Sequence, residues 1–270
     1  MQAIDLDLPH QAERLAAAVR EAGALARSMF GAPIRNWIKG ASSPVCDADI
    51  AVDALLRERL SDDGIAWLSE ESVDDPTRLA ARYVWIVDPI DGTRAYIAGL
   101  TDWAVSAALV ADGRPIAACL YAPLSEEFFM AVAGGGATCN GAPIAAAPGR
   151  ELAHMRLAGP KRLLERLQGM APPFTVMPRT HSLALRLTRV AQGTFDAAIA
   201  GGNSHDWDLA AADLLVHEAG GALTPFAGGP VIYNCPVPRH GMLVAAGRDR
   251  HAALIALIRE VRLTSSTIAS

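Results

Sequence analysis

Cysteine is scarce and scattered in this sequence of 270 residues, which contains only four. Cys46, Cys119, Cys139 and Cys235 form no CxxC pair, so the sequence predicts neither a zinc ribbon nor a disulfide framework. A chain without a disulfide framework suits a reducing compartment. We therefore expect a cytoplasmic protein.

Long apolar runs are missing as well. No stretch is long enough to cross a bilayer, so we expect no membrane partner. The N-terminal residues 1–15 are acidic and have no extended apolar core, which is not the pattern of a signal peptide. A composition of 51% hydrophobic and 6% aromatic residues is typical of a globular chain.

Clusters of basic residues are also absent. The sequence has 24 Lys and Arg against 29 Asp and Glu, a net charge of −5. No group of them forms the basic surface that nucleic acid requires, so we expect no nucleic-acid partner. The length suits one large domain or two halves that share a core.

The sequence does contain alternating helix and strand patterns. Apolar residues recur at helical spacing in residues 10–30, and two strand-like runs flank Asp112-Gly113, which indicates a hairpin. The run of residues 103–144 is typical of antiparallel pairs rather than of a βαβ repeat. Residues 42–49 are predicted as a polar loop in which Asp47 or Asp49 caps a helix. Further strands are predicted over 64–72, 83–88 and 195–201, and further helices over 182–193, 207–221 and 249–263.

One short stretch, residues 84–96, places two acids at the end of an apolar strand. Asp88 and Asp91 are separated only by Pro89 and Ile90, and their mutual repulsion suggests that a positive charge is expected there. Pro89 has no N–H to donate, so we expect it to end the strand ladder. The following turn could then aim both carboxylates and the Ile90 carbonyl at one point.

Three acidic pairs stand where strands end or helices begin: Glu70/Glu71, Asp88/Asp91 and Asp206/Asp208. An all-oxygen cluster suits Mg²⁺ and suits zinc poorly. Free N–H groups at Gly92 and Thr93, where a helix is expected to open, would make an anion site beside it. Together these features favour a bound phosphate ester.

Each motif taken alone also has a structural explanation. Asp-Pro-x-Asp-Gly is a common turn, a glutamate pair often ends a strand in solvent, and Asp208 could be a helix cap. His205-Asp206 is similar to a histidine-aspartate pair of another class of metal phosphohydrolases, but only His181 and His217 could supply its further histidines. Ser204-His205-Asp206 are neighbours, and adjacency does not make a catalytic triad.

In combination, the motifs resemble the inositol monophosphatase family of Mg²⁺-dependent, lithium-sensitive phosphatases. Its superfamily also includes 3′(2′),5′-bisphosphate nucleotidases and fructose-1,6-bisphosphatases. The resemblance runs in order across residues 39–221, through SPVCDAD (43–49), SEES (69–72), WIVDPIDGT (85–93) and WDLAAADLLVHEAGG (207–221).

This resemblance implies an α/β fold, a layered αβαβα sandwich, and generally a homodimer. We expect an N-terminal half of residues 1–148 and a C-terminal half of residues 149–270, with the active site between them. The family's ligands for two or three Mg²⁺ ions match Glu70, Asp88, the Ile90 carbonyl, Asp91 and Asp208.

The resemblance also assigns roles around the phosphate. Gly92 and Thr93 match the phosphate-binding turn, and Thr93 with Glu70 matches the pair that orients the attacking water. Asp49 matches an acid close to the metals. Substrate contacts are expected from Asp91, Gly92, Thr93, Arg94 and Asp208.

Several positions depart from the animal inositol enzymes. Gly201 stands where they have a glutamate that meets inositol hydroxyls, Asp206 replaces a cysteine, and Cys46 replaces a threonine. Arg94 either binds a second phosphate or lies along the helix surface in water. These departures leave the alcohol open among inositol phosphates, bisphosphate nucleotides, histidinol phosphate and sugar phosphates.

The sequence therefore predicts a Mg²⁺-dependent hydrolase of a small phosphate monoester, similar to inositol monophosphatase and needing no covalent phosphoenzyme. A 3′(2′),5′-bisphosphate nucleotidase is the alternative within the same chemistry. An inactive homologue that binds metal or phosphate is the alternative of another class.

Overall fold

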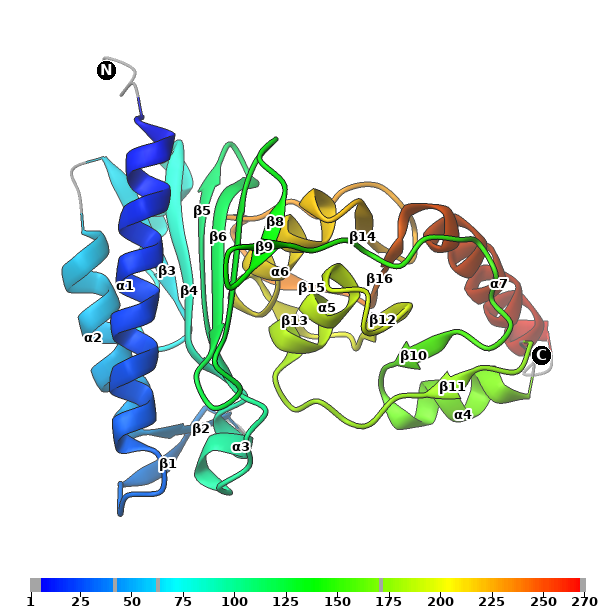
Figure 1. The fold of residues 1–270 in the computed structure, drawn as a ribbon, viewed down its shortest axis with the longest axis horizontal. Coiled ribbons are helices and arrows are strands. Elements are labelled where there is room, and N and C mark those ends of the chain that lie inside the picture. Colours follow the sequence, from blue (N-terminus) through cyan, green and yellow to red (C-terminus); the bar gives the residue numbers. More distant parts are fainter. Residues whose placement is uncertain (1–5, 41–42, 62–63, 170–171, 268–270) are drawn as a thin grey trace.

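A computed structural model describes residues 6–40, 43–61, 64–169 and 172–267, with side chains described to residue 259. Helices and sheets alternate in layers (Figure 1). The layered α/β sandwich predicted from the sequence is confirmed. None of the described helices is long and apolar enough to cross a membrane.

The first sheet has seven strands in the order β3-β4-β5-β6-β7-β8-β9. Only β3 and β4 run parallel, and the other neighbours are antiparallel. The antiparallel pairing predicted for residues 103–144 is confirmed. The strands are β3 (Ile65–Ser69), β4 (Tyr83–Asp91), β5 (Ala104–Ala111), β6 (Arg114–Ala122), β7 (Glu127–Val132), β8 (Ala137–Cys139) and β9 (Ala142–Pro143), with a 3₁₀ helix η1 (Pro76–Ala80) before β4.

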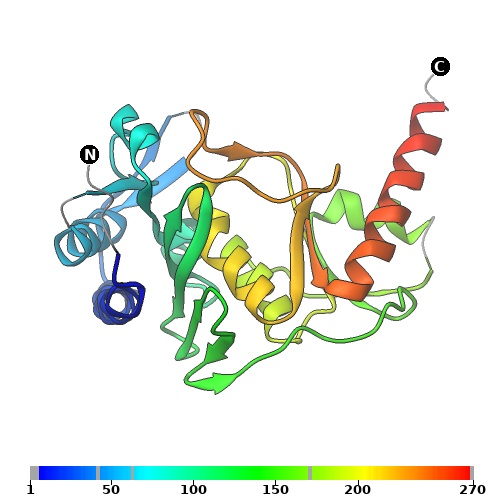
Figure 2. The same cartoon turned by 90° about the horizontal axis from the view of Figure 1, so that it is seen from above.

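Two helices, α1 (Leu8–Met29) and α2 (Asp47–Leu60), cover the outer face of this sheet (Figure 2). Asp7 caps α1 by accepting a hydrogen bond from the His10 N–H at 3.1 Å. The apolar stripe of α1 packs against Trp85 and Leu109 of the sheet in one buried cluster. The predicted polar loop before α2 was partly wrong, because β1 (Asn36–Lys39) and β2 (Ser43–Cys46) form a hairpin there.

The second sheet has five strands in the order β11-β10-β12-β16-β14. Two further helices, α4 (Lys161–Gln168) and α7 (Arg248–Thr267), lie on its outer side, where Leu164 and Leu254 join Val244 in a buried cluster. The strands are β10 (Arg156–Ala158), β11 (Thr175–Val176), β12 (Ala197–Ala200), β14 (Gly221–Pro225) and β16 (Leu243–Gly247).

The middle layer contains α5 (Leu183–Ala191) and α6 (Asp206–Glu218), between the two sheets (Figure 1). Leu120 from the first sheet and Leu215 from α6 belong to the same buried cluster, so the two sides share a core. The division at residues 148 and 149 falls between β9 and β10 and stays a prediction. Two short elements complete the fold: the helix α3 (Thr93–Ile97) and the pair β13 (Ser204–His205) and β15 (Arg239–His240).

Candidate metal centre

Three aspartates that are far apart in the sequence converge at the end of β4. Asp88 and Asp91 lie on β4, and Asp208 lies in the first turn of α6. One carboxylate oxygen from each lies within 4.8 Å of the others. Asp88 and Asp91 are buried, and Asp208 is half-buried. The predicted pair Asp88/Asp91 therefore contributes both of its residues to this group, whereas the pair Asp206/Asp208 contributes only Asp208.

A β-bulge brings Asp88 and Asp91 to the same side of the strand. Asp88 pairs with Ser106 and Asp91 with Ala104, so β4 has one extra residue in this interval. Residues three apart in a regular strand point to opposite faces, and the extra residue removes that obstacle. The prediction that Pro89 ends the strand ladder was wrong, because β4 continues to Asp91 and Pro89 lies in the bulge, where proline is tolerated.

The start of α5 holds Asp91 in place. The Ser182 hydroxyl donates to Asp91 Oδ2 at 2.5 Å, and the Ala184 N–H donates to the same oxygen at 2.6 Å. The Leu183 N–H donates to Oδ1 at 3.2 Å. The sequence interpretation missed Ser182, although a serine before an apolar helix is a recognisable cap.

Of the two adjacent glutamates, Glu70 is the one that interacts with Asp88 and Asp208. Burial, followed by the negative charge of Asp208, raises the pKa of Glu70 to about 8. Ser43 Oγ donates to Glu70 Oε1 at 3.2 Å. The Glu71 carboxylate instead pairs with Lys39 Nζ at 2.9 Å. Glu70 follows β3, which runs parallel to β4, so the two strands deliver their acids to one edge of the sheet.

The electrostatics of the group indicate a cation. Burial and then the charge of Asp208 raise the pKa of Asp91 to about 7. Burial, then Glu70 and Asp91, raise the pKa of Asp88 well above its ordinary value. Asp88 Oδ1 is buried without a hydrogen-bond partner among the described residues. A divalent ion that prefers oxygen ligands would satisfy this atom and offset the repulsion, so the residues fit Mg²⁺.

A chain of hydrogen bonds links the centre to the start of α2. Thr93 Oγ1 lies 3.0 Å from both Asp49 Oδ1 and the Ile90 carbonyl oxygen. Asp49 Oδ2 accepts from the Cys46 N–H at 2.9 Å and from Cys46 Sγ at 2.8 Å. Burial raises the pKa of the Cys46 thiol to about 12, so it stays protonated and acts as a donor. A cysteine can therefore replace the expected threonine at this position.

Gly92 and Arg94 flank Thr93 and differ in their surroundings. Gly92 has φ 98°, and a Cβ there would lie 3.2 Å from the Ser182 nitrogen and 3.3 Å from the Asp102 carbonyl oxygen. Both constraints favour glycine. The Arg94 side chain is exposed on α3.

The other predicted candidates have structural partners. Asp206 is fully buried and accepts from His240 Nε2 at 2.6 Å and from the Asn234 N–H at 2.7 Å. His181 Nδ1 lies 2.8 Å from Asp102 Oδ2. The His205 ring stacks on Trp207 at a centroid distance of 4.7 Å.

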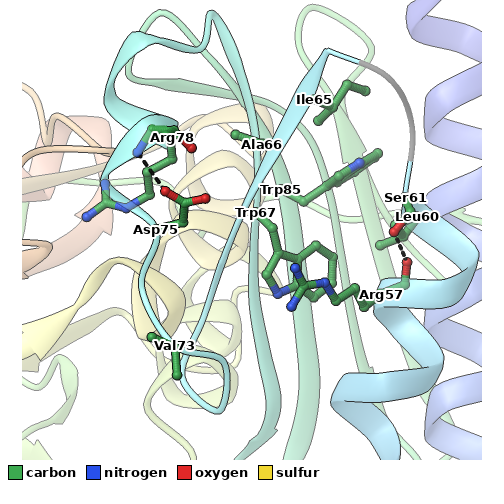
Figure 3. Close-up of a pocket in the computed structure, with 11 residues that line it drawn as sticks. Arg57, Leu60, Ser61, Ile65, Ala66, Trp67, Val73, Asp75, Arg78 and Trp85 are labelled. Carbon is green, nitrogen blue, oxygen red and sulfur yellow. Dashed lines mark hydrogen bonds between the residues drawn. The ribbon is translucent and has the colours of Figure 1, made fainter.

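A separate cavity of about 240 Å³ lies between α2, β3 and η1 (Figure 3). Arg57, Trp67, Trp85 and Arg78 are among the residues that line it. None of the predicted site residues contributes to its lining. This cavity therefore stands apart from the acidic group.

Comparison with known proteins identifies the family of this chain. The model of the inositol monophosphatase family matches residues 10–263. The chain belongs to the inositol monophosphatase family. The family includes relatives named as phosphatases, so the resemblance inferred from the sequence is confirmed.

Relatives in the family have several names. A histidinol-phosphatase of Mycobacterium tuberculosis is 36% identical over 219 residues, which are 76% of this chain and 83% of the relative. An inositol monophosphatase of Dictyostelium discoideum is 33% identical over 205 residues, 71% and 75% of the two chains. The crystal structure of the extragenic suppressor protein suhB from Bartonella henselae has a TM-score of 0.79 and 27% identity, covering 91% of this chain and 96% of that one.

Proposed function

We propose that this protein is a Mg²⁺-dependent phosphatase that hydrolyses a small phosphate monoester. One observation carries the proposal: the carboxylates of Asp88, Asp91 and Asp208 meet within 4.8 Å in a largely buried place. Family membership supports the same chemistry. The proposed metal ligands are these three aspartates, Glu70 and the Ile90 carbonyl.

Bound Mg²⁺ would supply acidity to a water molecule and neutralise the charge that develops on the attacking and leaving oxygens. The protein residues have the task of orienting that water. The Thr93 hydroxyl has a single proton and two acceptors, Asp49 Oδ1 and the Ile90 carbonyl oxygen, both at 3.0 Å. When it donates to Asp49, its lone pairs remain available to accept a hydrogen bond from the water. Glu70 would be the second acceptor of the pair.

The phosphate group itself would lie against the turn at Gly92 and Thr93. Gly92 has no side chain to obstruct the approach, and the backbone N–H groups of the turn can donate to phosphate oxygens. Asp91 and Asp208 border the same place and would reach the substrate through the metal ions. The attack then needs no covalent intermediate on the protein.

A phosphate-release assay tests the proposal. The panel comprises inositol 1-phosphate, 3′-phosphoadenosine 5′-phosphate, fructose 1,6-bisphosphate and histidinol phosphate, each with Mg²⁺ and with a chelator. We expect Mg²⁺-dependent release from at least one ester and its loss in an identically purified Asp88→Asn protein. Release that is equal in both proteins, or absent throughout, would favour the inactive metal- or phosphate-binding homologue.

The choice of ester separates the remaining candidates. Inositol monophosphatase-like activity and 3′(2′),5′-bisphosphate nucleotidase activity share the same metal chemistry and differ in the alcohol. Gly201 favours the second, because no carboxylate at that position accepts hydrogen bonds from a polyol. The nucleotidase is therefore the second candidate, and the same panel ranks the two.

The proposal includes a homodimer in the cytoplasm. The four cysteines are unbridged in the structure, which suits a reducing compartment. The homodimer rests on the family resemblance alone. Light scattering after size-exclusion chromatography would test it, and a monomer mass would contradict it.

A further inference from the structure

A second cavity, of about 760 Å³, lies between α4, β11 and α5. Its lining is partly apolar, through Leu164, Val176 and Met177, and partly cationic. A cavity of this size can enclose a ligand as large as a nucleotide. Figure 1 shows α4, β10 and β11 side by side at one end of the second sheet.

This cavity adjoins the acidic group. The Ala184 N–H binds Asp91, and Arg186, two residues further along α5, lines the cavity. Gly201 also lines the cavity. Arg186 lies close enough to Asp91 for their charges to interact. The cavity is therefore placed to receive the alcohol part of an ester whose phosphate lies at the aspartates.

The charges in the lining do not balance. Lys161, Arg179 and Arg186 face a single acid, Glu165, whose carboxylate lies 3.8 Å from Lys161 Nζ. Two arginines therefore remain beyond that pair. Arg186 and Arg179 lie close enough to interact electrostatically. Burial lowers the pKa of Arg186, the charge of Asp91 opposes this shift, and the charge of Arg179 adds to it.

Arg186 also has an unsatisfied donor. Its Nε atom is buried, and no hydrogen-bond partner for it exists among the described residues. A buried N–H group of a cation without an acceptor costs free energy, so such groups are normally paired. An anionic group in the cavity would supply the missing acceptor.

Gly201 leaves room for a side chain in the lining. A Cβ at this position would lie 3.7 Å from Pro160 Cγ, an ordinary van der Waals contact. Other residues can adopt the backbone conformation of Gly201, because its φ lies outside the left-handed region. A carboxylate introduced at this position would enter the lining that Arg186 shares.

We propose that Arg186 and Arg179 bind a second anionic group on the alcohol part of the substrate. The enzyme would then select phosphate esters that carry a further phosphate or a carboxylate. This inference rests on the proposed function and identifies the substrate class of that site. Apolar contacts with Leu164 and Met177 would accommodate a base or another hydrocarbon surface between the two anions.

Matched esters test the selection. Glucose 1-phosphate is compared with glucose 1,6-bisphosphate, and adenosine 3′-phosphate with adenosine 3′,5′-bisphosphate. A third pair, glycerol 2-phosphate and 2-phosphoglycerate, distinguishes a carboxylate from a second phosphate. We expect kcat/KM to be roughly 10-fold or more higher for the member with two anionic groups in at least one pair, as charge-assisted hydrogen bonds allow.

Arg186→Gln should remove this preference. We expect kcat/KM for the preferred ester to fall by roughly 10- to 100-fold, mainly through KM, with little change for the matched monophosphate. Arg57→Gln, in the cavity of Figure 3, is the control and should change neither ester. Arg94→Ala tests the competing arginine on α3. If Arg94→Ala alone removes the preference, or if Arg186→Gln affects both esters equally or neither, the inference is wrong.

Gly201→Glu provides a second, opposite change. Its carboxylate should pair with Arg186 and weaken binding of the esters with two anionic groups, whereas Gly201→Gln, of equal size, should keep the preference. Equal effects of the two substitutions would contradict a charge-based selection.

A chain that releases no phosphate from any ester would contradict the proposed function. Calorimetric binding of adenosine 3′,5′-bisphosphate would then test the cavity, and an unchanged Kd in Arg186→Gln would overturn the inference.

Discussion

The Ser182 hydroxyl donates a hydrogen bond of 2.5 Å to Asp91 Oδ2, although the two residues are 91 positions apart. Ser182 Oγ also accepts from the Leu185 N–H at 2.9 Å and so caps α5. One side chain therefore fixes both the start of a helix and the orientation of a proposed metal ligand. Residues that orient ligands usually influence metal affinity.

Ser182→Ala should raise the Mg²⁺ concentration needed for half-maximal activity by roughly 10-fold, because Asp91 loses a donor that holds it. The lost cap should also lower the free energy of unfolding by about 1 kcal/mol. Mg²⁺ titrations of activity and thermal melting measure the two effects. Ser182→Thr retains the hydroxyl and should restore the Mg²⁺ dependence; an unchanged Mg²⁺ requirement in Ser182→Ala would show that Ser182 acts only as a cap.

Asp91→Asn should abolish Mg²⁺-dependent turnover and leave the fold intact. The amide has nearly the same shape and removes one anionic ligand, so we expect a loss of more than about 100-fold, the upper range for residues that only orient ligands. Circular dichroism checks the fold. The exposed substitution Glu126→Gln is the matched control for loss of one acid. Near-normal activity of Asp91→Asn at limiting Mg²⁺ would contradict its role as a ligand.

Asp206→Asn should lower stability without changing the Mg²⁺ requirement, although Asp206 stands only two residues before Asp208. Its carboxylate binds His240 and the Asn234 N–H rather than the acidic group. The substitution weakens a buried charged hydrogen bond, so we expect the free energy of unfolding to fall by about 1–3 kcal/mol. The half-saturating Mg²⁺ concentration should stay unchanged. A large increase in that concentration with unaltered stability would place Asp206 among the ligands.

Metal-free protein should lose stability as the pH rises. The pKa of Glu70 is raised from 4.5 to about 8 and that of Asp91 from 3.8 to about 7, by burial and by the charge of Asp208. At these two carboxyls the folded state therefore binds more protons than the unfolded state between about pH 4 and pH 8. Their contribution to stability is complete below this window and is lost as the pH rises through it.

Mg²⁺ should reverse this trend, because it binds the ionised carboxylates of the native state. The increase in Tm caused by Mg²⁺, relative to a chelator, should be larger at pH 8.5 than at pH 5.5. Thermal melting at both pH values measures the difference. An equal increase at the two pH values, or a larger one at pH 5.5, would show that the acids do not hold protons in place of the metal.

Much of the fold could be predicted from local patterns in the sequence. The apolar run that becomes β4, the Asp112-Gly113 hairpin and the helix that carries Asp208 all have signals within a few residues. The stretch before α2 was misinterpreted because β2 is short and pairs only with the equally short β1. Pro89 was misinterpreted because its effect depends on whether a neighbouring strand accommodates a bulge.

The sequence by itself determined the acidic residues, their oxygen-only chemistry and the family motifs that contain them. Only the tertiary structure decided that Glu71 pairs with Lys39 and that Asp206 pairs with His240, while Glu70 and Asp208 interact with each other. The tertiary structure also placed Ser182 against Asp91 and Arg186 in a cavity beside them. Adjacent acids look alike in a sequence, because the partner of a side chain depends on which distant elements pack against its strand or helix.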